Sequence, residues 1–203
     1  MKQDLKLFFS LATSAVLSLG AFADTYKIDE THSTVGFKIK HLGISNVTGK
    51  FDDFAGNFYF DPKKPEASKA NAKIKLASVN TGLKQRDEHL KNEDFFNVAK
   101  NPEMSFESKS VKKIDENNYD VNGTLTLNGV SKPVVLKVEH LGDVKDPWGN
   151  ERSAFSATTK INRKDYGLSW NKAMETGGVI VGEEVSINLE VEGIKEKAAA
   201  AKK

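Results

Sequence analysis

Apolar and polar residues alternate with a period of two through most of the chain beyond residue 25, and no other feature limits the fold so strongly. The strictest run spans 185–192, and others follow the same rule at 35–39, 125–127, 134–138 and 155–161. Because successive side chains point to opposite faces of a strand, each run predicts a strand with one buried and one solvated face. Such single-faced alternation favours an antiparallel sheet, since parallel strands are usually apolar on both faces.

Turn-forming residues separate these runs and keep the connections short. About eight strands joined in this way predict an antiparallel meander in one domain, which we place at residues 24–194. The residues that favour chain reversal are Asp61-Pro62, Glu116-Asn117-Asn118, Asn128-Gly129, Asp146-Pro147 and Gly177-Gly178. Eight antiparallel strands can close into a barrel that is either filled by side chains or hollow enough for one small ligand.

Residues 81–99 break the alternation. Helix-forming residues replace β-branched ones there, and Asp87 and Lys91 have the i,i+4 spacing of a helical ion pair. We therefore expect a short helical insert between two strands, where it would cover an end of the barrel. A smaller irregularity concerns Phe51 and Phe54, which can both face inward only if the strand bends between them.

The first residues have the organisation of a signal peptide, which we place at 1–23. Lys2 and Lys6 precede an apolar run at 7–22, and the segment ends in the small-x-small pattern Ala21-Phe22-Ala23. We expect cleavage after Ala23 and localisation in the periplasm. The run is shorter than the roughly 20 apolar residues of a comfortable membrane span, so we do not expect the protein to span a membrane.

The composition excludes several classes of site. The chain has no cysteine, which rules out disulfides, thiolate zinc sites and cysteine nucleophiles. Its formal net charge is +2, with acidic and basic residues mixed along the chain, so no nucleic-acid partner is expected. The last residues, 195–203, are rich in Lys and Ala without an apolar face, and we expect them to form a solvated tail.

An ordered set of short motifs resembles the YceI family of lipocalin-like periplasmic proteins. The set spans residues 26–192, and the order of the motifs is more specific than any single one. The motifs are Tyr26-Lys-Ile-Asp29, Thr31-His32-Ser33, Val35-Gly-Phe37, His41, Gly49-Lys-Phe51 with Gly56, Arg86-Asp87-Glu-His89-Leu90, Phe95-Phe96, Pro102, Phe106, Gly123-Thr-Leu125-Thr-Leu127-Asn-Gly129-Val-Ser-Lys-Pro133-Val134, Asp165-Tyr166-Gly167-Leu168, Trp170 and Val181-Gly182-Glu-Glu-Val185.

The resemblance implies an all-β fold, namely an extended eight-stranded antiparallel lipocalin-like barrel with a short helical insert. It also implies a long pore that encloses a polyisoprenoid, quinone, fatty-acyl or similar long-chain amphiphilic lipid. It implies no cofactor and no established enzyme activity, and it is compatible with a homodimer. The function we expect is therefore that of a periplasmic binding or carrier protein.

Candidate ligand-binding residues fall into two groups. Apolar residues would line the pore, although the same residues would also build a filled core: Phe37, Phe51, Phe58, Phe60, Phe95, Leu125, Leu127, Trp170 and Met174. Arg86 and His89, three positions apart on the insert, share a helix face and could meet a phosphate or hydroxyl head group at the pore mouth. The alternative is that Arg86 pairs with a nearby carboxylate and fixes the insert.

No catalytic or metal site is expected. His32 and His41 are nine positions apart and would face opposite ways on a straight strand. His89 and His140 add no spacing typical of metal ligands. Two alternatives to a carrier remain open: an enzyme that acts on such a lipid at the mouth through His32, His41 or His89, and a filled barrel that serves as an interaction or stress-response module.

Overall fold

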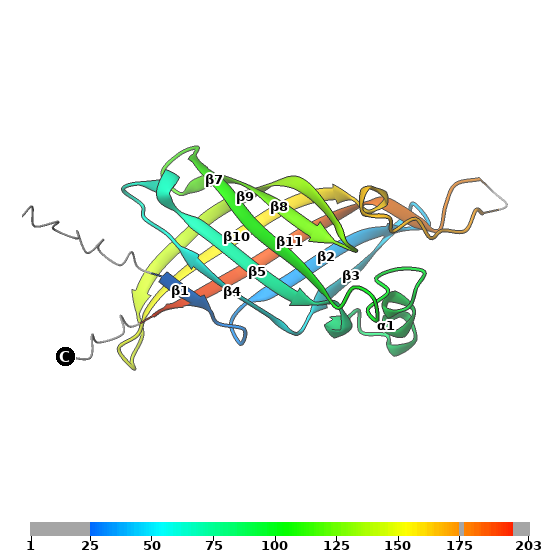
Figure 1. The fold of residues 1–203 in the computed structure, drawn as a ribbon, viewed down its shortest axis with the longest axis horizontal. Coiled ribbons are helices and arrows are strands. Elements are labelled where there is room, and N and C mark those ends of the chain that lie inside the picture. Colours follow the sequence, from blue (N-terminus) through cyan, green and yellow to red (C-terminus); the bar gives the residue numbers. More distant parts are fainter. Residues whose placement is uncertain (1–24, 175–176, 197–203) are drawn as a thin grey trace, which may run out of the picture.

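The sheet closes on itself to form a tube. The computed structural model describes residues 25–174 and 177–196, and Figure 1 shows its strands wrapping around one long axis. The eight-stranded ring is antiparallel throughout and has the order β1 (Thr25–Ile28), β4 (Phe54–Tyr59), β5 (Lys69–Lys75), β7 (Glu103–Lys113), β8 (Asn118–Leu127), β9 (Val130–Lys145), β10 (Glu151–Asn162) and β11 (Val181–Lys195). Because β1 also pairs with β11, the barrel is closed and the predicted fold class is confirmed.

Three of these strands continue past a break toward one end of the barrel. β2 (Thr34–His41) extends β1, β3 (Ser45–Phe51) precedes β4, and β6 (Val79–Asn80) extends β5 after the 3-10 turn η2 (Leu76–Ser78). The long strand β11 pairs with β1 near one end and with β2 over most of its length. The pairings of β2 with β3 and of β3 with β6 then carry the wall beyond the breaks.

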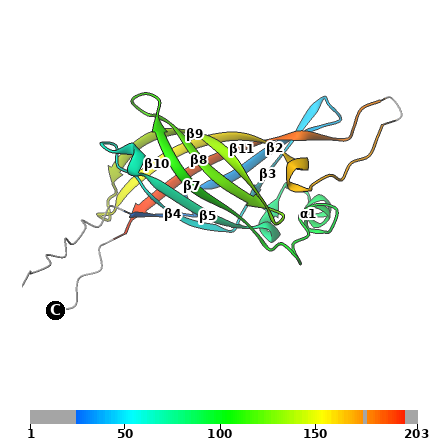
Figure 2. The ribbon, with the colours of Figure 1, turned by 45° about the horizontal axis from the view of Figure 1, so that its top comes forward.

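The predicted helical insert lies at this extended end, which we call the mouth. α1 (Lys84–Lys91) follows β6, and a series of turns leads from it to β7. Asp87 fixes the start of the helix, because its carboxylate accepts hydrogen bonds from the backbone N–H and the hydroxyl of Thr81, at 2.8 Å and 2.6 Å. Figures 1 and 2 both show α1 beside the end of the barrel at which β2 and β3 project. Among the described residues, no helix has the length and apolar character needed to cross a bilayer.

The wall between β9 and β10 is completed by a turn instead of by strand pairing. Within the described residues, the β9–β10 ladder ends at the pair formed by Lys137 and Thr158, although both strands extend further toward the mouth. The 3-10 turn η3 (Arg163–Tyr166) contacts both strands. Asn128 anchors it by donating a side-chain hydrogen bond to the carbonyl of Tyr166 at 3.0 Å. The Tyr166 side chain is 2% exposed, so this turn fills the wall where the ladder stops.

The main group of buried hydrophobic side chains gathers around the breaks in the sheet. Leu76 in η2 is completely buried, and Phe51 and Phe54, on either side of the β3–β4 break, are each 5% exposed. The break therefore turns both rings inward and confirms the bend expected from their odd spacing. The other buried members of the cluster are Ile74, Val79, Leu125, Leu127, Tyr166 and Leu168.

A network of charges crosses the seam at which the barrel closes. Arg152 of β10 contacts three carboxylates: Asp29 just after β1, Glu192 on β11, and Asp146 in the turn between β9 and β10. Its Nη1 lies 2.9 Å from Asp29 Oδ2, and its Nε lies 2.8 Å from Asp146 Oδ2. Burial alone would raise the pKa of Asp146, but hydrogen bonds from Arg152 and Asn150 outweigh it and hold that pKa well below its usual range.

The same network includes His32. The hydrogen bond from Thr31 has the largest effect on Asp29, and with those from His32 and Arg152 it lowers the pKa of Asp29 against the opposing effect of burial. Asp29, His32 and Glu192 offer donor atoms within 4.8 Å of one another. Because Arg152 already neutralises both carboxylates, the arrangement is a structural ion-pair network at the seam.

Truncating Leu76 should destabilise the barrel strongly. Leu76→Ala removes a fully buried side chain, and such a change costs about 2–5 kcal/mol of unfolding free energy because a cavity remains. Val144, which is 63% exposed, offers a control, since Val144→Ala should change stability by no more than about 0.5 kcal/mol. Urea unfolding followed by circular dichroism measures both. Equal effects of the two substitutions would contradict the buried position of Leu76.

The seam network should make stability depend on pH. The pKa values of Asp29 and Asp146 are lowered in the folded state, whereas an unfolded aspartate titrates near pH 4. Their stabilising contribution is therefore complete above about pH 5 and is lost as the pH falls through the folded values. Arg152→Gln should lower the unfolding temperature at pH 7, and its difference from the unmodified protein should shrink on acidification.

A matched control for this measurement is Lys160→Gln. The ion pair between Lys160 and Glu184 has exposed side chains on both partners, and such pairs contribute little to stability. Thermal unfolding at several pH values should therefore show a pH-dependent difference for Arg152→Gln and almost none for Lys160→Gln. A difference that stayed constant from about pH 7 to about pH 3 would contradict the assigned role of Arg152.

Candidate functional site

The lumen is hollow and holds two apolar cavities that share no lining residue. The mouth cavity, of about 340 Å³, is bounded by β2, β3, β11 and the insert that carries α1. The far cavity, of about 140 Å³, is bounded mainly by β4, β5 and the strands from β7 to β11. Almost all of the surface in both cavities comes from hydrocarbon and aromatic side chains. The barrel is therefore not filled by its own residues.

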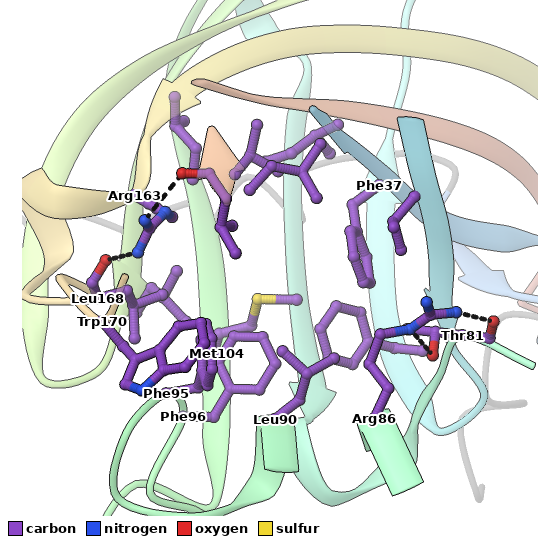
Figure 3. A pocket seen from close by; sticks show the side chains of 18 of the residues that line it. Phe37, Thr81, Arg86, Leu90, Phe95, Phe96, Met104, Arg163, Leu168 and Trp170 are labelled. Carbon is purple, nitrogen blue, oxygen red and sulfur yellow. Dashed lines mark hydrogen bonds between the residues drawn. The ribbon is translucent and has the colours of Figure 1, made fainter. Parts of the chain in front are cut away.

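Two segments far apart in the chain meet at the mouth cavity through aromatic rings. His89 of α1 lies edge-on to Phe95, with ring centroids 5.1 Å apart, and edge-on to Trp170, with centroids 5.0 Å apart. The rings of Phe95 and Trp170 are themselves 5.2 Å apart. The His89 Nε2 atom is 2.9 Å from Asp94 Oδ2, which holds the imidazole in place. Figure 3 shows Trp170 and Phe95 side by side on one wall of this cavity.

Arg86 lies on the wall across from these rings (Figure 3). Its Nε donates to the hydroxyl of Thr81 at 2.7 Å, and its Nη2 donates to the Thr81 carbonyl at 2.9 Å. Within the described residues it forms no ion pair with a carboxylate, and its Nη1 donates no hydrogen bond. Arg86 thus fixes the segment before α1, while part of its guanidinium is left for a ligand.

Arg163 is a second cation on the lining of the mouth cavity, and it is 2% exposed. Its hydrogen bonds within the described residues all go to backbone carbonyls: Nε donates to Gly182 at 2.8 Å, Nη2 donates to Val181 at 3.4 Å, and Nη1 donates to Leu168. Burial lowers the pKa of Arg163, although a guanidinium keeps its charge at physiological pH. These bonds tie η3 and Leu168 to β11, as the dashed lines in Figure 3 show.

The charged residues on the mouth cavity are all basic. Lys40, Arg86 and Arg163 line it, together with His41 and His89, whereas none of its lining residues in the described chain is a carboxylate. A desolvated carboxylate or phosphate would therefore find hydrogen-bond donors here and no like charge. The site combines hydrocarbon walls with a positive rim.

Glycines on the inner face of the wall lie under aromatic rings. A Cβ atom added to Gly49 would lie 2.4 Å from the ring of Phe37, and a Cβ added to Gly123 would lie 2.4 Å from the ring of Phe106. A Cβ added to Gly193 would likewise lie 2.4 Å from the ring of Phe58. Because each ring occupies the volume that a Cβ would need, it lies against the wall instead of across the lumen. These pairs keep the tube open despite its content of phenylalanine.

The far cavity is lined by a cluster of packed aromatic rings. Phe60 contacts Phe155 and Tyr119 edge-on, with centroids 5.0 Å and 5.4 Å apart, and lies 4.8 Å from the ring of His140. Phe155 also meets Phe58 edge-on at 5.2 Å. This cluster packs aromatic side chains around the smaller of the two cavities.

The structure distributes the residues expected at the site between the two cavities. Phe37, Phe51, Arg86, His89, Phe95, Leu125, Leu127 and Trp170 line the mouth cavity, and Phe58 and Phe60 line the far cavity. Met174 lines neither and lies in a loop beyond the mouth. Many other lining residues of the mouth cavity were not expected, among them Arg163, whose sequence context is that of an ordinary surface residue, and Met104, which lies outside any clear alternation.

Comparison with known proteins finds matches in one family, the YceI-like proteins. The YceI-like domain family matches residues 26–193. Protein YceI of Salmonella arizonae is 42% identical over 199 residues, which cover 97% of this chain and all of that protein. The crystal structure of the Campylobacter jejuni YceI protein is 41% identical, covers 83% of this chain and 96% of that one, and has a TM-score of 0.68.

A more distant structure shares the fold alone. It is a polyisoprenoid binding domain from Saccharophagus degradans, implicated in plant cell wall breakdown. It is 20% identical, with a TM-score of 0.63, and the match covers 84% of this chain and 98% of that domain.

Adding one carbon atom at Gly49 should narrow the mouth cavity. In Gly49→Ala the new Cβ would overlap the ring of Phe37, so the ring must swing toward the lumen. We expect weaker binding of an apolar fluorescent probe such as N-phenylnaphthylamine, and a recovery of binding in Gly49→Ala/Phe37→Leu. The double-mutant cycle separates this coupling from the two single effects. Additive effects would contradict a role for Gly49 in seating the ring.

Proposed function

The chain belongs to the YceI family, and we propose that it is a periplasmic binding protein that encloses the chain of a long amphiphilic lipid and carries or shields it. The observation that carries this proposal is the hollow apolar lumen, in which the mouth cavity and the far cavity both lie inside one closed wall. The segment at 1–23, which lies outside the described residues, supports the periplasmic location by its signal-peptide pattern.

Hydrocarbon walls are sufficient for useful affinity. At about 0.3 kcal/mol per heavy atom, a chain of about 20 carbon atoms would bind with about 6 kcal/mol of free energy, which corresponds to a dissociation constant of tens of micromolar. Such walls distinguish poorly between isoprenoid and acyl chains, because burial of apolar surface is not directional. The choice among lipids is then made by chain length and head group.

The basic rim supports a lipid whose head carries oxygen or negative charge. The Nη1 of Arg86 is available at the mouth cavity, and Lys40 lies on the same lining. A phosphate, carboxylate or carbonyl head held there would leave its chain directed into the lumen. The polyisoprenoid binding domain from Saccharophagus degradans, which has the same fold, supports the choice of a long-chain ligand by analogy.

The geometry favours binding over turnover. His32 lies outside the lumen and pairs with Asp29, with Nδ1 2.8 Å from Oδ2. His89 is packed between two rings and bonds Asp94. His41 lines the mouth cavity, and within the described residues it forms no side-chain hydrogen bond. His32 and His89 each have a carboxylate partner, but in the described residues no side-chain hydroxyl bonds the second ring nitrogen of either, which is where the nucleophile of an established triad lies.

Lipid recovered with the purified protein tests the proposal. The full-length chain would be expressed with its leader, released by osmotic shock and purified without detergent, and native mass spectrometry would then measure its mass. We expect a stoichiometric long-chain lipid in the unmodified protein. Val47→Trp should reduce the bound fraction, because Val47 lines the mouth cavity and the larger ring would fill it.

The matched control places the same ring outside the lumen. Leu141 is 54% exposed, so Leu141→Trp should retain the lipid. Repeated recovery of an empty protein from periplasmic extracts would overturn the proposed function. Recovery of the protein only in the cytoplasmic fraction, with its leader attached, would overturn the proposed location.

A further inference from the structure

A narrow tip projects from the mouth beyond the barrel, at the right of Figure 1. We define the tip as residues 41–45, which form the β2–β3 turn, together with 171–174 and 177–181. Its arms are joined by backbone hydrogen bonds, since the N–H of Leu42 donates to the carbonyl of Ile180 at 2.8 Å and Ala173 bridges to Val179. The tip is therefore one ordered unit, and Figure 2 shows it extending past α1.

Aliphatic side chains on the tip face solvent. Ile44 is 85% exposed, Val179 is 41% exposed and Leu42 is 37% exposed. Single exposed apolar residues are ordinary, but three that gather on adjoining arms at the end of a projection form a small apolar surface. Nothing in the described part of the chain covers it.

The turn holds Leu42 in a backbone conformation that leucine disfavours. Leu42 has φ 53° and Gly43 has φ 73°, a combination that tight hairpin turns normally meet with Asn-Gly. The chain itself uses the favoured pair at its other tight hairpin, where Asn128 has φ 52° and Gly129 has φ 75°. A left-handed leucine costs stability, and Leu42 is not among the residues that pack on the main buried cluster. Such strain points to a function for the side chain at this position.

The apolar surface of the tip is continuous with the lumen. His41, Ile180 and Val181 of the tip line the mouth cavity. They adjoin Leu42 and Val179 directly in sequence and across the β2–β11 pairing of His41 with Val181. A hydrocarbon chain could therefore pass from the end of the tip into the lumen along apolar contacts.

The charges around the tip are mainly positive. Lys40 and Lys172 are exposed, and neither forms an ion pair within the described residues. The carboxylates that follow the tip on β11 are already matched, since Glu183 pairs with Lys164 and Glu184 pairs with Lys160. Glu175 lies outside the described residues. Two free cations, Lys172 in the described tip and Lys40 directly before it, thus lie near its aliphatic side chains.

We propose that the tip docks on the surface of an anionic lipid bilayer, with Leu42, Ile44 and Val179 inserted among the acyl chains and the mouth held against the membrane. This inference rests on the proposed lipid-binding function, because it gives the route by which the lumen is loaded or emptied. A second copy of the chain fits less well, since three side chains offer far less than the roughly 1,200 Å² that a stable protein interface buries.

Flotation with lipid vesicles tests the docking. The mature chain would be mixed with phosphatidylcholine vesicles that either contain or lack phosphatidylglycerol, and we expect binding to the anionic vesicles that weakens as salt is added. Ile44→Ser should weaken binding by about tenfold, because an inserted aliphatic side chain is lost. Lys40→Gln and Lys172→Gln should each weaken it by about fivefold.

A substitution in the strained turn separates vesicle binding from stability, because it should weaken binding while making the fold more stable. Leu42→Asn should raise the unfolding temperature by about 2–4 °C, because asparagine accepts the left-handed backbone. The same substitution should weaken vesicle binding by about tenfold. The control is Leu141→Ser/Val144→Ser, which removes two exposed aliphatic residues from the opposite end of the barrel and should leave vesicle binding unchanged.

Separate loading of the lumen distinguishes this proposal from the proposed function. Lipid supplied in a cyclodextrin complex should enter the Leu42→Asn and Ile44→Ser variants as well as the unmodified protein. Normal loading without vesicle binding in the unmodified protein would overturn the docking alone, and failure to load any lipid would overturn the binding function alone. Vesicle binding that persists in both variants, or a dimer in analytical ultracentrifugation that they dissociate, would overturn the assigned partner.

Discussion

Every feature of the molecule depends on the pairing of one short strand with two partners. β1 contains four residues, yet it bonds β4 on one side and β11 on the other and so joins the two ends of the sheet. Without that closure the sheet would have two open edges and no interior. The chain has no cysteine to replace these bonds with a covalent link. Arg152 reinforces the seam from outside, because it binds Asp29 at the end of β1 and Glu192 on β11.

Closure alone does not make a cavity, because eight strands enclose a volume that side chains can fill. The interior stays hollow because several inward positions are glycines that leave room for an aromatic ring close to the wall, as Gly49 does for Phe37 and Gly123 for Phe106. The wall is apolar as a result, and the few charges that reach it are basic. In this YceI family member, the close contact between wall glycines and aromatic rings leaves an apolar pore that suits a chain-like ligand.

The strands and the bend at residues 52 and 53 could be predicted because each depends on local spacing along one strand. The alternation at 185–192 became the central part of β11, and the odd spacing of Phe51 and Phe54 required the break that the structure shows. The contact of Phe37 with Gly49 could not be predicted, since it depends on the register between two strands. The buried position of Arg163 could not be predicted for a similar reason. Its carbonyl acceptors belong to Leu168, Val181 and Gly182, and only the folded chain brings all three to its guanidinium. Met174 was expected at the ligand and instead lies outside both cavities.

The position of β11 at the end of the chain also constrains how the molecule assembles. This strand pairs with β10, β2 and β1, and its ladder with β1 joins Tyr26 to Lys195 across nearly the whole sequence. Contacts of such long range make folding slow, because the entropy of closing a large loop is lost before the contacts can form. Since β11 is the last strand of the barrel in sequence, the ring cannot close until that strand has been synthesised, and the lumen forms only when all of its wall is present.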